Sequence, residues 1–233
     1  MRARFVDLAP DGFEERAVGG GVELAAYGDA AERVREAFAG ADVRTVEDGW
    51  EDRWREFHHG VRIGALWVGP PWEAAPDDVV AIVVDPGRAF GTGAHPTTRL
   101  CLELLADVEP GSLVDVGCGS GVLSIAAVRL GFAPVVAVDV AAAAVEATLA
   151  NAAANEVELE ARVLDALTEP LPAADAVVAN IALDAVEVLA PRVEANLLVT
   201  SGYLARDTPH LAGFVCVERR EREGWAAELH ARK

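Results

Sequence analysis

The pattern of apolar and polar residues changes near residue 79. From there on, short apolar runs alternate with longer alanine-rich segments of helical periodicity. Most of the runs are apolar at nearly every position, which is typical of parallel strands covered by helices on both faces. The expected strands are Val79–Val84, Leu113–Val116, Val135–Val138, Leu159–Val163, Ala176–Ala179 and Leu197–Thr200, and the expected helices are Thr97–Leu105, Val122–Leu130, Ala142–Ala154 and Asp184–Val193. The alternation predicts a doubly wound α/β domain, with an antiparallel pair at its end over Phe214–Glu218 and Trp225–His230.

The residues before this point form shorter elements separated by turn residues. Gly21–Tyr27 alternates apolar and polar residues and predicts a half-buried strand. Ala30–Ala39 has helical spacing, and Val43–Val46 is expected to be one more short strand. Together these elements predict a small α+β unit over residues 1–46.

Three aromatic residues, Trp50, Trp54 and Phe57, follow at a spacing that places their rings on one helical face. We interpret them as packing residues rather than a ligand cage. The proline-bearing stretch 69–78 predicts a linker or a surface turn. We therefore expect three segments: a first domain at 1–46, a linker with an aromatic-rich helix at 47–78, and the α/β domain at 79–233.

The chain is strongly acidic, with a net charge of −18 over 233 residues and Lys233 as its only lysine. Acidic residues are in excess in both halves. Such a surface repels phosphate backbones, so we expect no direct contact with nucleic acid. A basic protein or a small molecule fits better as a substrate, although acidity that serves solubility alone explains the charge equally well.

No apolar run reaches the roughly 18 residues of a membrane helix, and charge at Arg2 and Arg4 is atypical of a secretion signal. The three cysteines, Cys101, Cys118 and Cys216, are odd in number and widely spaced. This pattern favours neither a disulfide framework nor a metal site, and it is typical of a reducing cytoplasm.

The clearest chemical signal is a glycine-rich loop between the strand Leu113–Val116 and a helix. Gly117 and Gly119 open this loop, and glycines let a backbone approach a ligand closely. The next strand ends in Asp139, 22 residues beyond Gly117, where a carboxylate can accept hydrogen bonds from ribose hydroxyls. The nicotinamide fingerprint needs a third glycine at the position of Val122. The spacing therefore favours a nucleoside ligand without a pyrophosphate, S-adenosylmethionine.

Two further polar residues follow later strands of the predicted sheet. Asp165 lies where it could meet an adenine amine, but a capping or surface carboxylate explains it as well. Asn180 ends the strand Ala176–Ala179, at the edge where open parallel sheets bind ligands. It could also be a helix N-cap. The residues after it differ from the Pro-Pro-aromatic sequence of many amino-group methyltransferases.

The segment Asp85–Thr98 is rich in glycine, proline and threonine, and we expect it to form an ordered loop near the cofactor loop. His95 within it is a candidate base. A histidine directly before a proline at a helix start is more often a turn residue, and we favour that interpretation.

These motifs resemble those of a known family, the bacterial methyltransferases of ribosomal protein L11 called PrmA. The segments that carry the resemblance, in the order of the family motifs, are Gly49–His58, Leu66–Pro70, Asp85–Thr98, Val114–Leu130 and Val178–Ile181. The resemblance covers residues 49–204 well and extends loosely through Trp225. The loop Asp85–Thr98 is fairly specific to the family, whereas the glycine loop is shared by methyltransferases in general.

The resemblance implies a Rossmann-like class I methyltransferase with a ferredoxin-like N-terminal domain that grips the substrate. It implies a cofactor site made by Thr98, Gly117, Asp139 and Asn180, with Asn180 closest to the transferred methyl group. The family substrate is the basic ribosomal protein L11, methylated on lysine side chains and an N-terminal amine.

The chain departs from the family at two places. Ala141-Ala142 replace the usual Asp-Pro after the ribose acid. The N-terminal domain is short, because the sequence begins near its expected first helix, Arg2–Leu8, and the first strand has no candidate. We expect either a start upstream of Met1 or a truncated domain. Three other functions stay open: methylation of another protein or a small molecule, nicotinamide-dependent oxidoreduction, and partner binding without catalysis.

Overall fold

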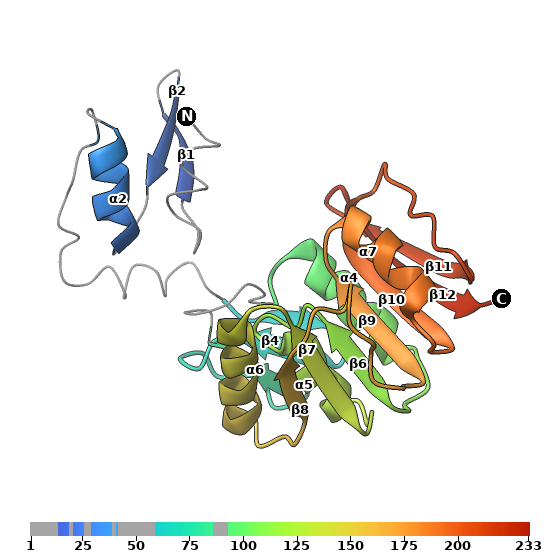
Figure 1. The fold of residues 1–233 in the computed structure, drawn as a ribbon. Helices are drawn as coiled ribbons and strands as arrows, with labels where there is room; N and C mark the ends of the chain where they lie inside the picture. The colour runs from blue at the N-terminus through green and yellow to red at the C-terminus, as the bar shows by residue number, and fades with distance from the viewer. Residues whose placement is uncertain (1–13, 19–20, 26–28, 39–40, 42–58, 86–92) are drawn as a thin grey trace. The chain divides into compact units, whose positions relative to one another are not determined.

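The computed structural model describes residues 14–18, 21–25, 29–38, 41, 59–85 and 93–233 (Figure 1). The chain divides into two compact units, residues 1–53 and 54–233, each of which is described by itself. The elements expected at Arg2–Leu8 and Val43–Val46, and the aromatic face of Trp50, Trp54 and Phe57, lie outside the described residues.

Within its described residues, the first unit contains a hairpin and one helix. Strand β1 (Glu14–Val18) pairs antiparallel with β2 (Gly21–Ala25), and helix α2 (Asp29–Ala37) follows. The expected strand and helix are confirmed, but β1 was not expected, because its polar sequence lacks an apolar alternation. Ala30 and Val34, one turn apart on α2, are both buried.

The second unit is built on a seven-stranded sheet in the order β11-β12-β10-β9-β6-β7-β8. The strands are β6 (Leu113–Val116), β7 (Val135–Asp139), β8 (Glu160–Val163), β9 (Ala176–Asn180), β10 (Leu197–Leu204), β11 (Phe214–Arg222) and β12 (Trp225–Arg232). The first five are parallel, and β12 runs antiparallel to both of its neighbours. This order confirms the doubly wound fold, including the antiparallel pair at its end. The chain builds outward from β6 in one direction and then from β9 in the other, so the topological switch point lies between these two strands.

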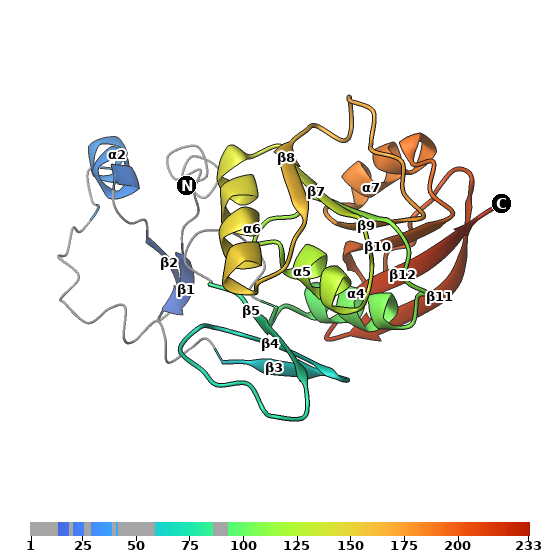
Figure 2. The same ribbon diagram turned by 90° about the horizontal axis from the view of Figure 1, so that it is seen from below.

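Helices cover both faces of this sheet. Helices α4 (Pro96–Ala106), α5 (Val122–Arg129) and α6 (Ala142–Ala154) contribute to one apolar core, and α7 (Leu183–Leu189) packs into a second core on the opposite face. Figure 2 shows α4 and α7 on opposite sides of the sheet. The four helices were expected at nearly these bounds, except that the expected last one ends as a 3-10 turn, Ala190–Arg192.

The expectation that Val79–Val84 belongs to the large sheet is wrong. Its strand exists as β5 (Val80–Val83), but β5 pairs parallel with β4 (Leu66–Gly69), which pairs antiparallel with β3 (Val61–Ile63). The three form a separate sheet that packs on the same core as α4 and α5 (Figure 2). An apolar run indicates that a strand is buried but does not show which strand it pairs with. The sequence therefore could not show to which of the two sheets this strand belongs.

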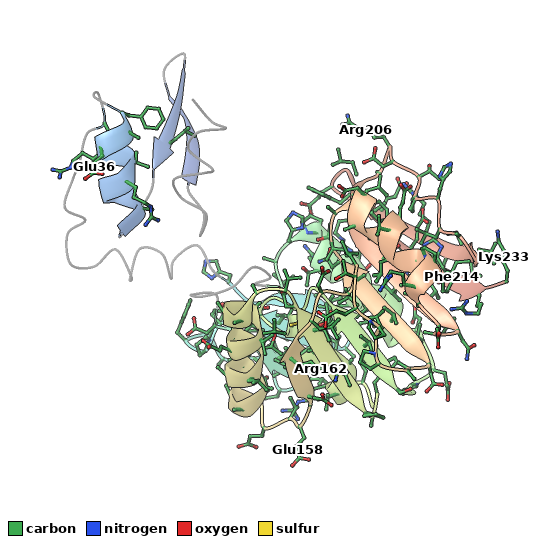
Figure 3. The ribbon with its side chains drawn as sticks, in the orientation of Figure 1. Glu36, Glu158, Arg162, Arg206, Phe214 and Lys233 are labelled. Carbon is green, nitrogen blue, oxygen red and sulfur yellow. The ribbon has the colours of Figure 1, made fainter. Side chains whose placement is uncertain are left out.

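Charged and aromatic side chains mark the two edges of the large sheet. Glu158 precedes the edge strand β8 and Arg162 lies on it (Figure 3). At the other edge, Phe214 begins β11 beneath the guanidinium of Arg232, whose Cζ lies 5.0 Å from the ring centroid. Charge on an edge strand discourages pairing with other chains.

Within the described part of the chain, every helix is too short or too polar to cross a membrane.

Candidate active site

The glycine loop leaves β6 at the switch point and turns directly into α5. Gly117 has a φ of 73° and Gly121, the N-cap of α5, a φ of 81°, both in the left-handed region. The amides of Gly117 and Cys118 donate to Val138 O on β7, at 2.9 and 3.1 Å. The loop is therefore fixed against the end of β7, as the sequence predicts.

Asp139 ends β7 beside this loop. Its Oδ2 accepts from Gly119 N at 3.1 Å and its Oδ1 from Ala141 N at 2.9 Å. Ala141 is the N-cap of α6 and provides no side-chain cap, so Asp139 fixes the start of this helix through the amide of the N-cap residue alone. Each carboxylate oxygen has a second lone pair, so this geometry is compatible with two further hydrogen bonds from ribose hydroxyls.

Asn180 ends β9 and faces α4. Its Nδ2 donates to Thr98 Oγ1 at 3.4 Å, which joins two predicted site residues that are 82 positions apart in the chain. The N-cap of α7 is Ala182, so the alternative of Asn180 as a helix cap is wrong. Because the amide nitrogen is used, the Oδ1 of Asn180 is left as an acceptor.

The position of Asn180 depends on a close backbone contact that the sequence did not reveal. Gly202, at a bulge of β10, has a φ of 103°, and a Cβ there would lie 2.1 Å from Ile181 O. On the other side of Ile181, a Cβ on Gly117 would lie 2.5 Å from Ile181 Cγ2. Two glycines therefore leave the space in which Ile181, the residue after Asn180, can pack. Of the two, only Gly117 belongs to a recognisable motif.

A buried carboxyl group lies directly beneath the loop. Asp115 on β6 is 1% exposed, and its Oδ2 accepts from Ser124 Oγ of α5 at 2.6 Å. Its Oδ1 has no hydrogen-bond partner among the described residues. Burial, with a smaller contribution from Asp139, raises the pKa of Asp115 to about 6. An acid inside an otherwise apolar strand is the sequence feature that marks Asp115 as a buried carboxyl group.

Asp165 forms a local turn after β8. Its Oδ2 accepts from Thr168 Oγ1 at 2.8 Å and its Oδ1 from Leu167 N at 3.0 Å. These hydrogen bonds hold the pKa of Asp165 below its ordinary value. Asp165 is thus the surface-loop carboxylate that the sequence left open and not a helix cap, since the described residues between β8 and β9 contain no helix. Its hydrogen bonds leave acceptor capacity on both oxygens.

His95 is the N-cap of α4. Its Nδ1 accepts from Thr97 N at 3.4 Å and lies 2.8 Å from Thr97 Oγ1, and its ring meets Trp225 edge-on with centroids 4.9 Å apart. Burial lowers the pKa of His95, partly offset by Glu223. The structure agrees with the turn interpretation favoured from the sequence.

The thiol of Cys118 in the glycine loop is unreactive. Its Sγ lies 3.3 Å from Thr148 Oγ1 of α6, and burial raises the pKa of Cys118 to about 12. A thiol with so high a pKa stays protonated near neutral pH and is a poor nucleophile.

Among the described residues, one group of three possible metal ligands lies away from the loop, with Cys216, Glu228 and His230 offering atoms within 4.8 Å of one another. The carboxylate already has partners, because Arg219 donates to one oxygen and His230 Nε2 lies 3.2 Å from the other. Burial raises the pKa of Glu228, but the His230 and Arg219 contacts outweigh it and hold that pKa below its ordinary value. We interpret the group as a set of structural contacts that link β11 to β12.

Comparison with known proteins decides the family. The family model described as "Ribosomal protein L11 methyltransferase (PrmA)" matches residues 24–233. This chain belongs to the PrmA family. The resemblance drawn from the motifs is confirmed, and the match reaches residues on both sides of the division at residue 53.

Individual PrmA proteins agree with this assignment. A Vibrio cholerae protein named ribosomal protein L11 methyltransferase is 42% identical over 182 residues, which cover 76% of this chain and 61% of that protein. A Colwellia psychrerythraea protein of the same name is 42% identical over 172 residues, 70% of this chain and 59% of its own length. The chain thus spans about three fifths of the length of these curated PrmA relatives.

A solved structure of a ribosomal protein L11 methylase matches the fold of three quarters of this chain. The structure of ribosomal protein L11 methylase from Lactobacillus delbrueckii subsp. bulgaricus has a TM-score of 0.66 and 30% sequence identity, covering 75% of this chain and 99% of that one. The Rossmann-like methyltransferase fold expected from the sequence is therefore confirmed.

Proposed function

We propose that this chain transfers methyl groups from S-adenosylmethionine to amino groups of ribosomal protein L11. The observation that carries the proposal is the convergence of Gly117, Asp139 and the Asn180–Thr98 pair at the carboxyl edge of the sheet, in a chain of the PrmA family. Open α/β sheets bind their ligands at this edge, beside the switch point.

The charges beneath the loop suit this cofactor. Asp115 has a buried oxygen that meets no hydrogen-bond partner among the residues that the structure describes, and the nearby Asp139 is close enough to raise its pKa. Two neighbouring carboxyl groups favour a cationic ligand, such as one with a sulfonium and an ammonium group, and disfavour the pyrophosphate of a dinucleotide. The residues present therefore fit S-adenosylmethionine.

Each site residue has a role that follows from its position. Gly117 and Gly119 let the backbone approach the cofactor, and Asp139 accepts from its ribose hydroxyls. Asp165 faces the adenine amine in this proposal. Thr98 holds the amide of Asn180.

When bound, the cofactor supplies a methyl group that is already activated on a sulfonium. The protein has to orient a neutral amine, and at a lysine pKa near 10.4 only about one amine in 2,000 is neutral at pH 7. Because Asn180 Nδ2 is bonded to Thr98, its Oδ1 is left to accept an N–H of the amine and to aim the lone pair. A desolvated position beside positive charge lowers the pKa of that amine.

The substrate side of the proposal rests on charge and family. The net charge of −18 suits a basic protein, and PrmA relatives carry the name of L11. We propose lysine side chains, the N-terminal amine or both as acceptors, without direct contact to nucleic acid. We assign recognition of L11 to residues 1–46 and methyl transfer to 79–233. Residues 47–78 connect the two, and their strands β3 and β4 pack on the core of the methyl-transfer domain.

Asn180→Ala tests the chemistry. The variant loses the acceptor that aims the amine but keeps the glycine loop and Asp139, so turnover should fall by about 100-fold while cofactor affinity changes by less than about fivefold. Single-turnover methylation and calorimetric titration with S-adenosylhomocysteine measure the two effects. Asn196→Ala, at an exposed asparagine, is the matched control and should keep full turnover. Near-normal turnover in Asn180→Ala would remove Asn180 from the mechanism.

A further inference from the structure

Helix α6 presents a buried polar stripe to the glycine loop. Thr148 and Asn151 lie on this face and Asn155 is the C-cap of the helix, and the three are 0%, 6% and 4% exposed. Packing alone would be served by apolar residues, whereas buried polar side chains cost stability unless every group is bonded. The contacts of this stripe therefore indicate a positioning task.

The first end of the stripe holds the glycine loop. Thr148 Oγ1 donates to Gly119 O at 3.1 Å, and Asn151 Nδ2 donates to Ser120 O at 2.8 Å. A Cβ on Gly121 would lie 3.0 Å from Thr148 Cα, so the helix and the loop are in direct backbone contact. Two successive loop carbonyls are thus fixed by side chains of α6.

The other end of the stripe holds the three-stranded sheet. Asn155 Oδ1 accepts from Val83 N at 2.8 Å, and its Nδ2 donates to Val83 O at 2.6 Å, so this amide pairs with β5 as a neighbouring strand would. Asn151 Oδ1 accepts from Asp85 N at 3.2 Å. Asn155 Nδ2 also donates to Asn151 O at 2.7 Å, which joins the two asparagines.

Asn151 is therefore bonded on both sides, to the cofactor loop through Nδ2 and to Asp85 through Oδ1. We propose that Asn151 is a positioning residue that couples cofactor binding at the glycine loop to the backbone of β5 and Asp85. The coupling rests on the proposed cofactor site. A ligand that steadies Ser120 O also steadies the Asn151 amide, and through it the hydrogen bond from Asp85 N.

Amide hydrogen exchange of the full chain, with and without saturating S-adenosylhomocysteine, tests this coupling. In the native protein the exchange of the Asp85 amide should slow by about tenfold on binding. In Asn151→Ala this ligand-dependent protection should vanish, although calorimetry still detects ligand binding. The smaller side chain admits water to Ser120 O and Asp85 N, so the fold should persist.

Asn155→Ala is the matched control, because it removes an amide from the C-cap of the same helix without touching the glycine loop. It should speed exchange at Val83 with and without ligand, yet keep the ligand-dependent slowing at Asp85. An unchanged Asp85 amide in the native protein on ligand binding would overturn the coupling, even if neither variant folds. Equal loss of ligand-dependent protection in both variants would overturn the role of Asn151. Failure of S-adenosylhomocysteine to bind the native chain at all would instead contradict the proposed function.

Discussion

Asp115 is the residue whose ionisation most directly affects the proposed cofactor site. It is buried, its Oδ1 lacks a partner among the described residues, and its pKa is raised to about 6 by burial and, to a smaller extent, by Asp139. Two thiols, Cys101 and Cys118, also interact with it, but burial raises the pKa of both far above neutral, so neither titrates with it. The charge of Asp115 is thus set by pH in the range where enzymes are assayed.

The affinity for a cationic cofactor should therefore depend on pH. Only ionised Asp115 attracts the cation, and the ionised fraction of the free protein grows as pH rises through about 6, so the Kd should fall by about tenfold between pH 5 and pH 7 and then level off. Calorimetric titration with S-adenosylhomocysteine, which keeps the ammonium group, measures this profile. Asp115→Asn should bind more weakly with a flat profile, and an identical pH dependence in the variant would exclude Asp115 as its source.

The residue scale also shows where sequence reasoning stops. Gly117, Asp139 and Asn180 could be located because each ends a strand or begins a loop at the ligand-binding edge. Gly202 could not, since its importance lies in a contact with Ile181 O that only the folded backbone creates. The same holds for Asn151, whose two partners are 31 and 66 positions away.

At the scale of elements, the bulge in β10 affects the position of the backbone that follows β9. Between Ser201 and Tyr203 the pairing with β12 shifts, and Gly202 lets Ile181 approach. The parallel strands of the large sheet were predictable because their apolar runs alternate with helical segments. Strands β3 and β4 were not, because no helical segment separates them and proline follows β4 directly.

Gly202→Ala tests the bulge. Its φ of 103° and a Cβ 2.1 Å from Ile181 O require a backbone shift, so unfolding free energy should fall by more than about 2 kcal/mol and turnover should fall with it. Gly64→Ala is the control, because Gly64 has a φ of 58° but open space around its Cβ, and should cost only about 1 kcal/mol. Denaturant unfolding and single-turnover assays supply both values. Equal losses of unfolding free energy in the two variants would show that the contact with Ile181 adds nothing to the cost of a side chain in the left-handed region.

For the whole molecule, the family, the fold and the edge chemistry support the proposed methyl transfer, while the proposed recognition of the substrate is argued from charge and assigned to the first unit. That unit contains β1, β2 and α2 among its described residues, and the chain spans about three fifths of its curated PrmA relatives. Fold class was predictable because the α/β alternation is a local pattern. Substrate recognition was not, because it depends on a surface formed by several elements together.

Mass spectrometry of purified ribosomal protein L11 after incubation with this chain and S-adenosylmethionine tests the central claim most directly. The proposed function predicts mass increases in steps of one methyl group on lysine or N-terminal peptides, and their loss when Asn180→Ala replaces the native chain. Unmodified L11, together with normal binding of S-adenosylhomocysteine by the same preparation, would contradict L11 as the substrate.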